Sequence, residues 1–355
     1  MSTTTLQSPV SATVGARAPV MLVVRRLGTA LPSVAGVIVV TFLLTRALPG
    51  DPAVYFAGIA ATQQAVEQIR HQMGFDRSLP VQFLDYFGQL THGDLGTSLT
   101  TGQPVLSELL TRLPASAELG LTALCLSVAI AVPLGIAAAT RPGSLVDHSC
   151  RIITTAGVSL PTFFTGLLLV YLFYYLAGWA PAPLGRLDAF STAPPRWSGF
   201  YLIDSLVAHD LDVFRASLAQ LILPAATLAI FSLAPLARIT RAAMLAALGS
   251  EFVRTARASG LPPLRIVFVY AFRNAVLPVI TTLGIVCSFL IGGSVLVEKV
   301  FAWPGIGSYA VEALIASDYA SVQGFVLMMA LLYVLLNLCI DIVYGLVDPR
   351  VRLEA

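Results

Sequence analysis

Charged residues are scarce in this sequence. Only 11% of its 355 residues are charged, whereas 57% are hydrophobic, and the mean hydropathy is +0.82. An ordinary soluble domain carries about a quarter charged residues, so this chain cannot cover a water-facing surface. In lipid, backbone polar groups must be satisfied within each segment, which helices achieve on their own. The alternating pattern of membrane-barrel strands is absent. We therefore predict an all-α membrane protein.

The sequence also lacks the motifs of common catalytic sites. Its single lysine, Lys299, lies between Glu298 and Val300, so the Gly-Lys-Ser/Thr sequence of a phosphate-binding loop is absent. The histidines show no His-Glu-x-x-His spacing, the cysteines form no Cys-x-x-Cys pair, and no Gly-x-Ser-x-Gly elbow occurs. We expect the cysteines to serve as small apolar packing residues. We predict no catalytic residue, no metal site and no cofactor in this chain.

Long apolar runs are abundant instead. Six of them reach the length of about 20 residues that crosses a hydrocarbon core of roughly 30 Å. They cover residues 27–45, 115–139, 152–177, 216–237, 275–297 and 322–347. The first run is too long for a cleaved signal peptide and is interpreted as a retained anchor. The preceding residues 1–24, rich in Ser, Thr and Ala, are expected to form a disordered tail.

Arginine placement predicts the orientation of the six spans. The stretches before the first span, between spans two and three, between spans four and five, and after the last span are rich in arginine. Basic residues favour the cytoplasmic side, so both termini, including the tail 349–355, are predicted to be cytoplasmic. The arginines are Arg25, Arg26, Arg141, Arg151, Arg238, Arg241, Arg254, Arg257, Arg265, Arg273, Arg350 and Arg352.

Three segments then face the other side of the membrane: 46–114, 178–215 and 298–321. The first is unusually long, and its periodicity predicts one helix over 62–73 and a second over 81–90. Long loops with helices of their own are usually functional or form a lid. We therefore group residues 25–114 as the first span with an extracytoplasmic helical segment, and 115–348 as the transmembrane core. Glu118, near the outer end of span two, is expected to be solvated.

The cytoplasmic stretch 238–275 is predicted to form a helix, a bend and another helix. A helix leaving span four would end at Gly249, and Ser250 is placed to cap a short helix over 251–259. Gly260 can adopt a left-handed conformation, and the following Pro262-Pro263 prevents continuation. Charge alone leaves open whether this is a docking element or an ordinary basic loop.

Several motifs resemble the permease subunits of ABC importers, specifically the B-type subunit of the peptide/nickel family. They run in order over nearly the whole chain after the tail, which makes the match specific. The motifs are Leu-Pro-Gly-Asp-Pro at 48–52, Met-Gly-Phe-Asp-Arg-Ser-Leu-Pro-Val-Gln at 73–82, Gly-Asp-Leu-Gly-Thr-Ser at 93–98, Phe-Ala-Trp-Pro-Gly-Ile-Gly at 301–307, Asp-Tyr at 318–319 and Asp-Pro-Arg-Val-Arg at 348–352. The stretch 238–278 resembles the family's coupling loop, although Arg254-Thr255-Ala256 stands where the general motif has Glu-Ala-Ala.

This resemblance implies a type I ABC importer transmembrane domain in the cytoplasmic (inner) membrane. The implied partners are a second homologous permease, two ATPase subunits that carry ATP and Mg, an extracytoplasmic solute-binding protein and the lipid bilayer, with no nucleic acid. The short cytoplasmic helix would dock on an ATPase subunit and move as a lever. The residues that the resemblance assigns to coupling are Glu251, Arg254, Thr255, Ala256, Arg257 and Gly260.

Candidates for the translocation pathway are fewer. Span three contains Ser159, Pro161, Phe163 and Phe164, where proline breaks the helix at membrane depth. Asn337 and Asp341 lie one helical turn apart on span six. Both sets have a structural alternative, namely helix packing for span three and an ion pair with a loop arginine for Asp341. Helix packing is also the alternative to cavity lining for Gly284, Gly292 and Gly293 in span five.

By resemblance, the predicted function is ATP-driven import of di- or oligopeptides. Nickel, glutathione, opines and metallophores remain alternative substrates of the same type of permease. A secondary transporter is the alternative from a different class, although pathway charges and inverted repeats are not evident.

Overall fold

The computed structural model describes residues 31–43, 61–72 and 76–347, together with residues 28, 46, 53–54 and 74. The predicted tails at 1–24 and 349–355 and the motif at 48–52 lie outside the described residues. Regular structure in the described chain is helical, and one isolated β-bridge joins Thr97 to Pro104. The prediction of an all-α chain is confirmed for this part.

Four helices of the described chain are long and apolar enough to cross a membrane. They are α5 (Val105–Thr140), α9 (Leu211–Leu248), α14 (Tyr319–Val347) and the continuous helix formed by α11 (Pro263–Arg265), η2 (Ile266–Ala271) and α12 (Phe272–Val300). These cover predicted spans two, four, five and six. Two shorter apolar helices, Leu31–Leu43 and Thr162–Leu176, fall on predicted spans one and three.

The third predicted span is interrupted before Pro161, as the proline predicted, and its apolar helix begins at Thr162 and not at residue 152. It divides into α6 (Leu145–Ala156) and α7 (Thr162–Leu169), and α7 continues into the π-helical segment η1 (Val170–Leu176). Pro161 starts α7 as its N-cap, where its missing N–H costs nothing. The turn before it packs closely, because a Cβ on Gly157 would lie 2.9 Å from the carbonyl oxygen of Ile230.

The outer segment contains both predicted helices, as α3 (Gln63–Gln72) and α4 (Leu79–Thr91). α5 begins at Val105, ten residues before the expected start of span two, so the helix of that span extends into this segment. Pro114 lies inside this helix and deprives the Leu110 carbonyl of its usual N–H partner. The exposed Arg196 donates to that oxygen at 3.4 Å.

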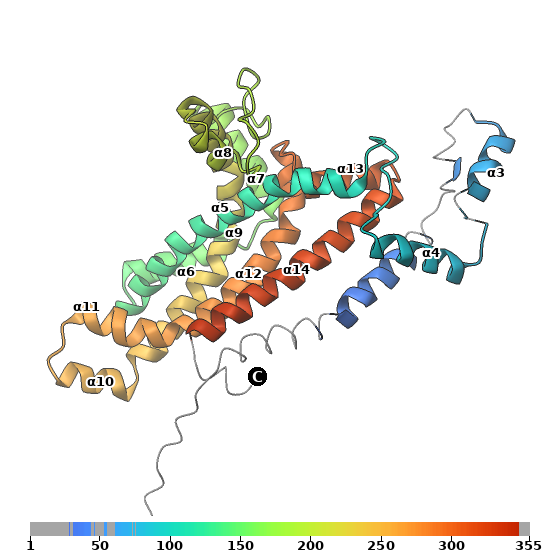
Figure 1. The fold of residues 1–355 in the computed structure, drawn as a ribbon. Helices are drawn as coiled ribbons and strands as arrows, with labels where there is room; N and C mark the ends of the chain where they lie inside the picture. Colours follow the sequence, from blue (N-terminus) through green and yellow to red (C-terminus); the bar gives the residue numbers. More distant parts are fainter. Residues whose placement is uncertain are drawn as a thin grey trace, which may run out of the picture.

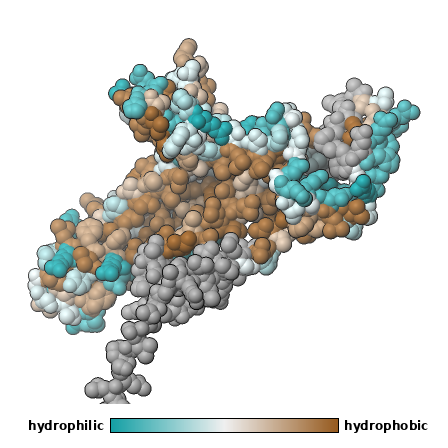
Figure 2. Space-filling view, viewed as in Figure 1, coloured by the Kyte–Doolittle hydropathy of each residue, from teal (hydrophilic) through white to brown (hydrophobic). Residues whose placement is uncertain are grey.

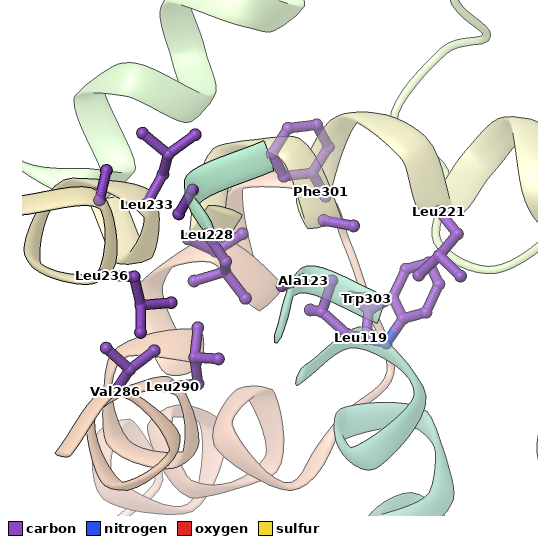
Figure 3. Close-up of a cluster of buried hydrophobic side chains, with 14 of the residues drawn as sticks. Leu119, Ala123, Leu221, Leu228, Leu233, Leu236, Val286, Leu290, Phe301 and Trp303 are labelled. Atoms are coloured by element: carbon purple, nitrogen blue, oxygen red, sulfur yellow. The ribbon is translucent and has the colours of Figure 1, made fainter. Parts of the chain in front are cut away.

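The core of the bundle lies where α5, α9 and α12 meet. Figure 3 shows Leu119 and Ala123 of α5 facing the leucines of α9 and Val286 and Leu290 of α12. Small residues permit the close contact between α5 and α9, because a Cβ on Gly135 would lie 2.7 Å from the Cβ of Thr240. The packing of α12 on α14 is similar, since a Cβ on Gly284 would lie 2.9 Å from Ile340.

The long helices have two different ends. In Figure 1, α10 (Glu251–Ala258) and α11 lie at one end, and α8 (Tyr201–Val207), α13 (Ile306–Ile315) and α4 lie at the other. On the face that Figure 2 shows, hydrophobic residues cover the long helices, and hydrophilic residues are concentrated at both ends. This distribution matches a bundle that crosses a bilayer.

Candidate functional site

The predicted helix–bend–helix is present at the α10 end of the bundle. α9 ends at Leu248 with Gly249 as its C-cap, α10 covers Glu251–Ala258, and Gly260 has a φ of 73°. A Cβ on Gly260 would meet no atom within 4 Å, so glycine is required there by backbone conformation and not by space. The left-handed bend predicted at Gly260 is confirmed.

The capping prediction for Ser250 is only half right. Ser250 occupies the N-cap position of α10 in an extended conformation, but its hydroxyl makes no cap to α10. It donates to the carbonyl oxygen of Ala247 at 2.5 Å. The last carbonyls of α9 lack helical partners, and the tight turn brings one of them within reach of this hydroxyl.

α10 has one buried side and one exposed side. Val253 and Ala256 are buried, with 0% and 5% of their surface exposed, in a cluster with Met244 of α9 and Ile266 of η2. Ala256 therefore faces the chain's own core. The other predicted coupling residues are exposed, as is Phe252. The exposed set is Glu251, Arg254, Thr255, Arg257 and Gly260.

The exposed side of α10 carries both signs of charge. Arg254 donates to Glu251 at 3.0 Å, and both side chains are more than three-quarters exposed (79% and 85%). Pairs this exposed contribute little to stability and are free to exchange partners. Arg257 also lines a pocket of about 350 Å³ with Thr140, Leu248 and Pro263. A partner could therefore contact α10 on a mixed polar and apolar surface.

A buried ion pair fixes the neighbouring loop at this end. Arg241 of α9 holds Asp147 of α6 in a two-pronged contact, with nitrogen-to-oxygen distances of 2.5 and 3.0 Å. The backbone N–H of Gly143 also donates to Asp147, at 3.0 Å. The hydrogen bonds from Arg241 and then from Gly143 hold the pKa of the Asp147 carboxyl well below its usual range. The α5–α6 connection is thereby tied to the helix that leads to α10.

The predicted pathway residues of span three lie on an exposed surface of the chain. Phe163 and Phe164 are 40% and 46% exposed, and Pro161 is exposed beside them. Ser159 is also exposed and donates to the Thr155 carbonyl at 2.7 Å, within its own helix turn. These four residues are brought together near the break between α6 and α7.

The second predicted pair, Asn337 and Asp341, lies far along the chain on α14. Asn337 donates to the Tyr333 carbonyl of its own helix at 2.9 Å, and both residues are half-buried. An apolar cavity of about 220 Å³ occurs elsewhere, between α5, α12 and α14. It is lined by Gly120, Cys287, Ser294 and Leu336 among others, and by none of the predicted pathway residues.

At the opposite end, two family-like motifs meet around one carboxylate. Asp318, fully buried at the start of α14, accepts from the Ser98 hydroxyl at 2.6 Å and the Leu99 N–H at 2.9 Å. The Ser321 hydroxyl donates to the same oxygen at 2.7 Å, and Tyr309 donates to Ser321 at 2.7 Å. The sequence placed 93–98 and 318–319 more than 200 residues apart, and Asp318 joins them.

A second buried pair disproves the expectation that Glu118 is solvated. Glu118 is 4% exposed and accepts from Arg186 at 2.5 Å and from the Leu202 N–H at 2.9 Å. Arg186 also donates to the Gly199 carbonyl and lies 3.4 Å over the ring of Tyr201. A helix carboxylate thus anchors the outer segment that contains α8.

The 301–307 motif packs around another buried carboxylate. Glu298 is fully buried and accepts from the Ser116 hydroxyl at 2.7 Å and the Ser308 N–H at 2.8 Å. A Cβ on Gly305 would clash with both Ser116 and Glu298, so only glycine fits there. Trp303 is buried and donates from Nε1 to the Ala115 carbonyl at 2.8 Å. Next to this cluster, Lys299 pairs with Glu312 at 2.6 Å.

Cysteines and metal-binding residues add no site. Of the four cysteines only Cys150 is buried, Cys287 is half-buried, and Cys125 and Cys339 are exposed, so the expectation of buried packing holds for one of them. In the part of the chain that the structure describes, no three His, Cys, Asp or Glu side chains gather as a metal site would require.

Sequence reasoning missed the buried charges Asp147, Glu118, Arg186 and Glu298 and the half-buried Arg241 that pairs with Asp147. Each stands in or beside an apolar stretch where an ionised group is costly unless it is paired or hydrogen-bonded. That scarcity is the signal that could have drawn attention to them. Their partners lie too far away in the sequence to be assigned from spacing.

Comparisons with known proteins agree with this architecture. Residues 131–353 match the family of binding-protein-dependent transport system inner membrane components, and residues 20–120 match the N-terminal family of such membrane components. The chain is 46% identical to a probable D,D-dipeptide transport system permease protein of Escherichia coli (strain K12), over 90% of this chain and 93% of that protein. It is 43% identical to a di/tripeptide transport system permease protein of Pseudomonas aeruginosa (strain UCBPP-PA14), over 93% and 98%.

The match over residues 131–353 covers α10, the Asp147–Arg241 pair and Asp318, and the N-terminal match covers Ser98 and Leu99, which donate to Asp318. The N-terminal match covers α3, α4 and the start of α5. The chain is therefore a multi-pass membrane protein that belongs to the family of binding-protein-dependent transport system inner membrane components.

Proposed function

We propose that this chain is a permease subunit of an ATP-driven ABC importer for di- or oligopeptides in the cytoplasmic membrane. It would pair with a second homologous permease, receive substrate from an extracytoplasmic solute-binding protein, and be driven by two separate ATPase subunits that carry ATP and Mg. The relatives described above are named as permeases for dipeptides or di/tripeptides, which supports this substrate class. The chain itself would be non-catalytic.

The observation that carries the proposal is the two-sided character of α10. Its inner side holds it on α9 and η2 through Val253 and Ala256, so it moves with those helices. Its outer side presents Arg254, Arg257 and Phe252 at the end of the bundle. An element that is firmly held on one side and exposed on the other can transmit a partner's movement to the spans. In this scheme Ala256 positions the helix, and the exposed residues contact the ATPase.

We infer six spans for this arrangement, with both termini cytoplasmic. The apolar helix Leu31–Leu43 would be part of span one, and α7 with η1 would form span three. The α10 end carries Arg141, Arg238 and Arg257 and would face the cytoplasm. The end with α8, α13 and α4 would then face outward, toward the binding protein. The exposed Phe163 and Phe164 would face the second permease or the pathway between the two.

Charge reversal on α10 tests the docking role. The double variant Arg254→Glu and Arg257→Glu should lose the ATPase subunits during purification of the assembled transporter in mild detergent, and peptide uptake should fall with it. Arg215→Glu is the matched control, because Arg215 is 78% exposed on the opposite end of α9. Retention of the ATPase subunits and of uptake by the double variant would contradict docking through α10.

The bend at Gly260 offers a second test. A β-branched residue at a φ of 73° is strained, whereas asparagine tolerates the left-handed region. Gly260→Val should therefore impair uptake while the binding protein still binds its peptide, and Gly260→Asn should retain most of the uptake.

Competition with nickel salts, glutathione and an opine in the same uptake assay separates the alternative substrates. Uptake of one of these in place of peptides would overturn the substrate class.

A further inference from the structure

α4 has an apolar face that the described chain leaves uncovered. Val81, Leu84 and Phe87 follow one another at intervals of three residues and are 40%, 67% and 45% exposed. Residues three apart share one face of a helix, so these side chains form a continuous stripe. Neither the coupling scheme nor the buried clusters described above uses this stripe.

The remaining surface of α4 divides into two other sectors. Phe83 and Tyr86 turn inward onto Phe42, with ring centroids 5.2 and 5.8 Å apart. Asp85 and Gln89 lie on the third side and are exposed, and Asp85 pairs with Arg77 at 3.0 Å. Asp85 is the only charged residue within α4. A helix with one anchored, one apolar and one polar sector has the form of an interfacial membrane helix.

The anchor also sets the depth of α4. Phe42 is 2% exposed and lies in the last turn of the apolar helix Leu31–Leu43, and Arg46 just beyond it donates to Gln82 of α4 at 2.9 Å. α4 is therefore held beside Arg46 and the last described turn of the apolar helix, and an arginine that follows an apolar helix favours the membrane interface. Figure 1 shows α4 crossing this end and not extending the helix in its own direction.

The apolar stripe continues a surface that already faces lipid in a membrane protein. Val40 and Leu43, in the last turns of the apolar helix, are 53% and 51% exposed. Figure 2 shows hydrophilic residues on the upper side of the α4 region and hydrophobic residues on its lower side, toward the long helices. A lipid surface covers such a stripe without any further protein, and Phe and Leu are typical of the apolar face of an interfacial helix.

We propose that α4 lies in the plane of the membrane interface, with Val81, Leu84 and Phe87 inserted among the lipids. It would fix the outer segment to the bilayer beside the first span. This inference depends on membrane insertion of the chain and not on its substrate or on ATPase docking.

Spin labelling of the assembled transporter tests the proposal. The transporter is reconstituted in vesicles of phosphatidylethanolamine and phosphatidylglycerol, with the native cysteines of all subunits replaced by alanine. Leu84→Cys and Gln89→Cys each carry a nitroxide, and the collision rates with oxygen, which enters lipid, and with a water-soluble nickel chelate are compared. The ratio of oxygen to nickel collisions should be several-fold higher at 84 than at 89. Val81→Cys should behave like Leu84→Cys.

Two outcomes would overturn the proposal. Equal access of the nickel chelate to labels at 84 and 89 would show that the stripe faces water. An immobile label at 84 that neither reagent reaches would show that a protein partner covers the stripe. Neither outcome requires a loss of peptide uptake, which is measured on the same transporter. Failure of this proposal is therefore distinguishable from failure of the proposed function.

Discussion

The two ends of the bundle are built differently. At the end that carries α8 and α13, the carboxylates of Glu118, Glu298 and Asp318 are buried, and hydroxyls, backbone N–H groups or an arginine satisfy them. At the α10 end, Asp147 and Arg241 tie α6 to α9, but small apolar contacts hold α10 itself, and its charges are exposed. Buried networks determine one geometry, whereas exposed charges remain available to another molecule. The end that carries α8 and α13 is thus fixed within this chain, whereas α10 presents charges that another molecule can contact.

Breaking the outer end at Glu118 and Arg186 should have the largest effect. Arg186→Ala leaves a buried carboxylate without its cation, which typically costs about 3–5 kcal/mol. Thermal unfolding of the purified protein in detergent would show this as a large drop in the transition temperature. Arg196→Ala, at an exposed arginine of the same outer segment, should change little. Equal effects of the two variants would mean that the buried pair is not what holds α8 in place.

Removing the Asp318 carboxylate should have a smaller and more local effect. Asp318→Ala leaves the donors of Ser98, Leu99 and Ser321 unpaired in a buried site, at a cost of about 1–3 kcal/mol. Hydrogen–deuterium exchange should accelerate in residues 97–101 and at the start of α14, but not in α10. Unchanged exchange at 97–101 would show that the contact does not order this segment.

Neighbouring residues of α10 should separate packing from docking. Val253→Ala removes two methyl groups from a buried site and should cost about 2 kcal/mol. Arg254→Ala, on the exposed side, should change stability by no more than about 0.5 kcal/mol. Unfolding in detergent compares the two directly. A larger loss from Arg254→Ala would contradict the assignment of inner and outer sides.

The smallest expected effect is that of pH on the Asp147–Arg241 pair. The stability that this pair contributes should not vary with pH over the ordinary range. A carboxyl whose pKa is lowered on folding contributes stability above its ordinary value of 3.8, and this is lost only as pH falls through the lower folded pKa. The stability difference between the wild type and Asp147→Asn should therefore be constant from pH 8 to 5. Exchange protection of α6 at several pH values would measure it. A difference that disappears near pH 6 would contradict the lowered pKa.

The sequence predicted the parts of this fold that depend on local patterning. Apolar length located the four long helices, and the Gly260-Leu261-Pro262-Pro263 run located the bend after α10, because hydropathy and backbone conformation are properties of short segments. It failed where distant groups decide the outcome. Glu118 is buried because Arg186 reaches it from another segment, and Asp318 is buried because Ser98 and Leu99 reach it from more than 200 residues away.

The candidate site shows the same division between features set by local sequence and features set by distant contacts. The position of α10 follows from sequence, whereas its buried side depends on packing against α9 and η2, which turns Val253 and Ala256 inward and leaves Phe252 exposed. The functional identity of the residues in span three cannot follow from one chain, because Phe163 and Phe164 lie on a surface whose neighbours belong to other subunits in the proposed assembly.

The solitary Lys299 has a practical consequence. Its amine is the only lysine amine that the chain offers, and it lies at the outer end of α12, 2.6 Å from Glu312 of α13. An amine-selective dye or crosslinker used near neutral pH can therefore react with only one side chain of this subunit. A fluorophore attached there would report the local environment at the junction of α12 and α13 without any engineered cysteine.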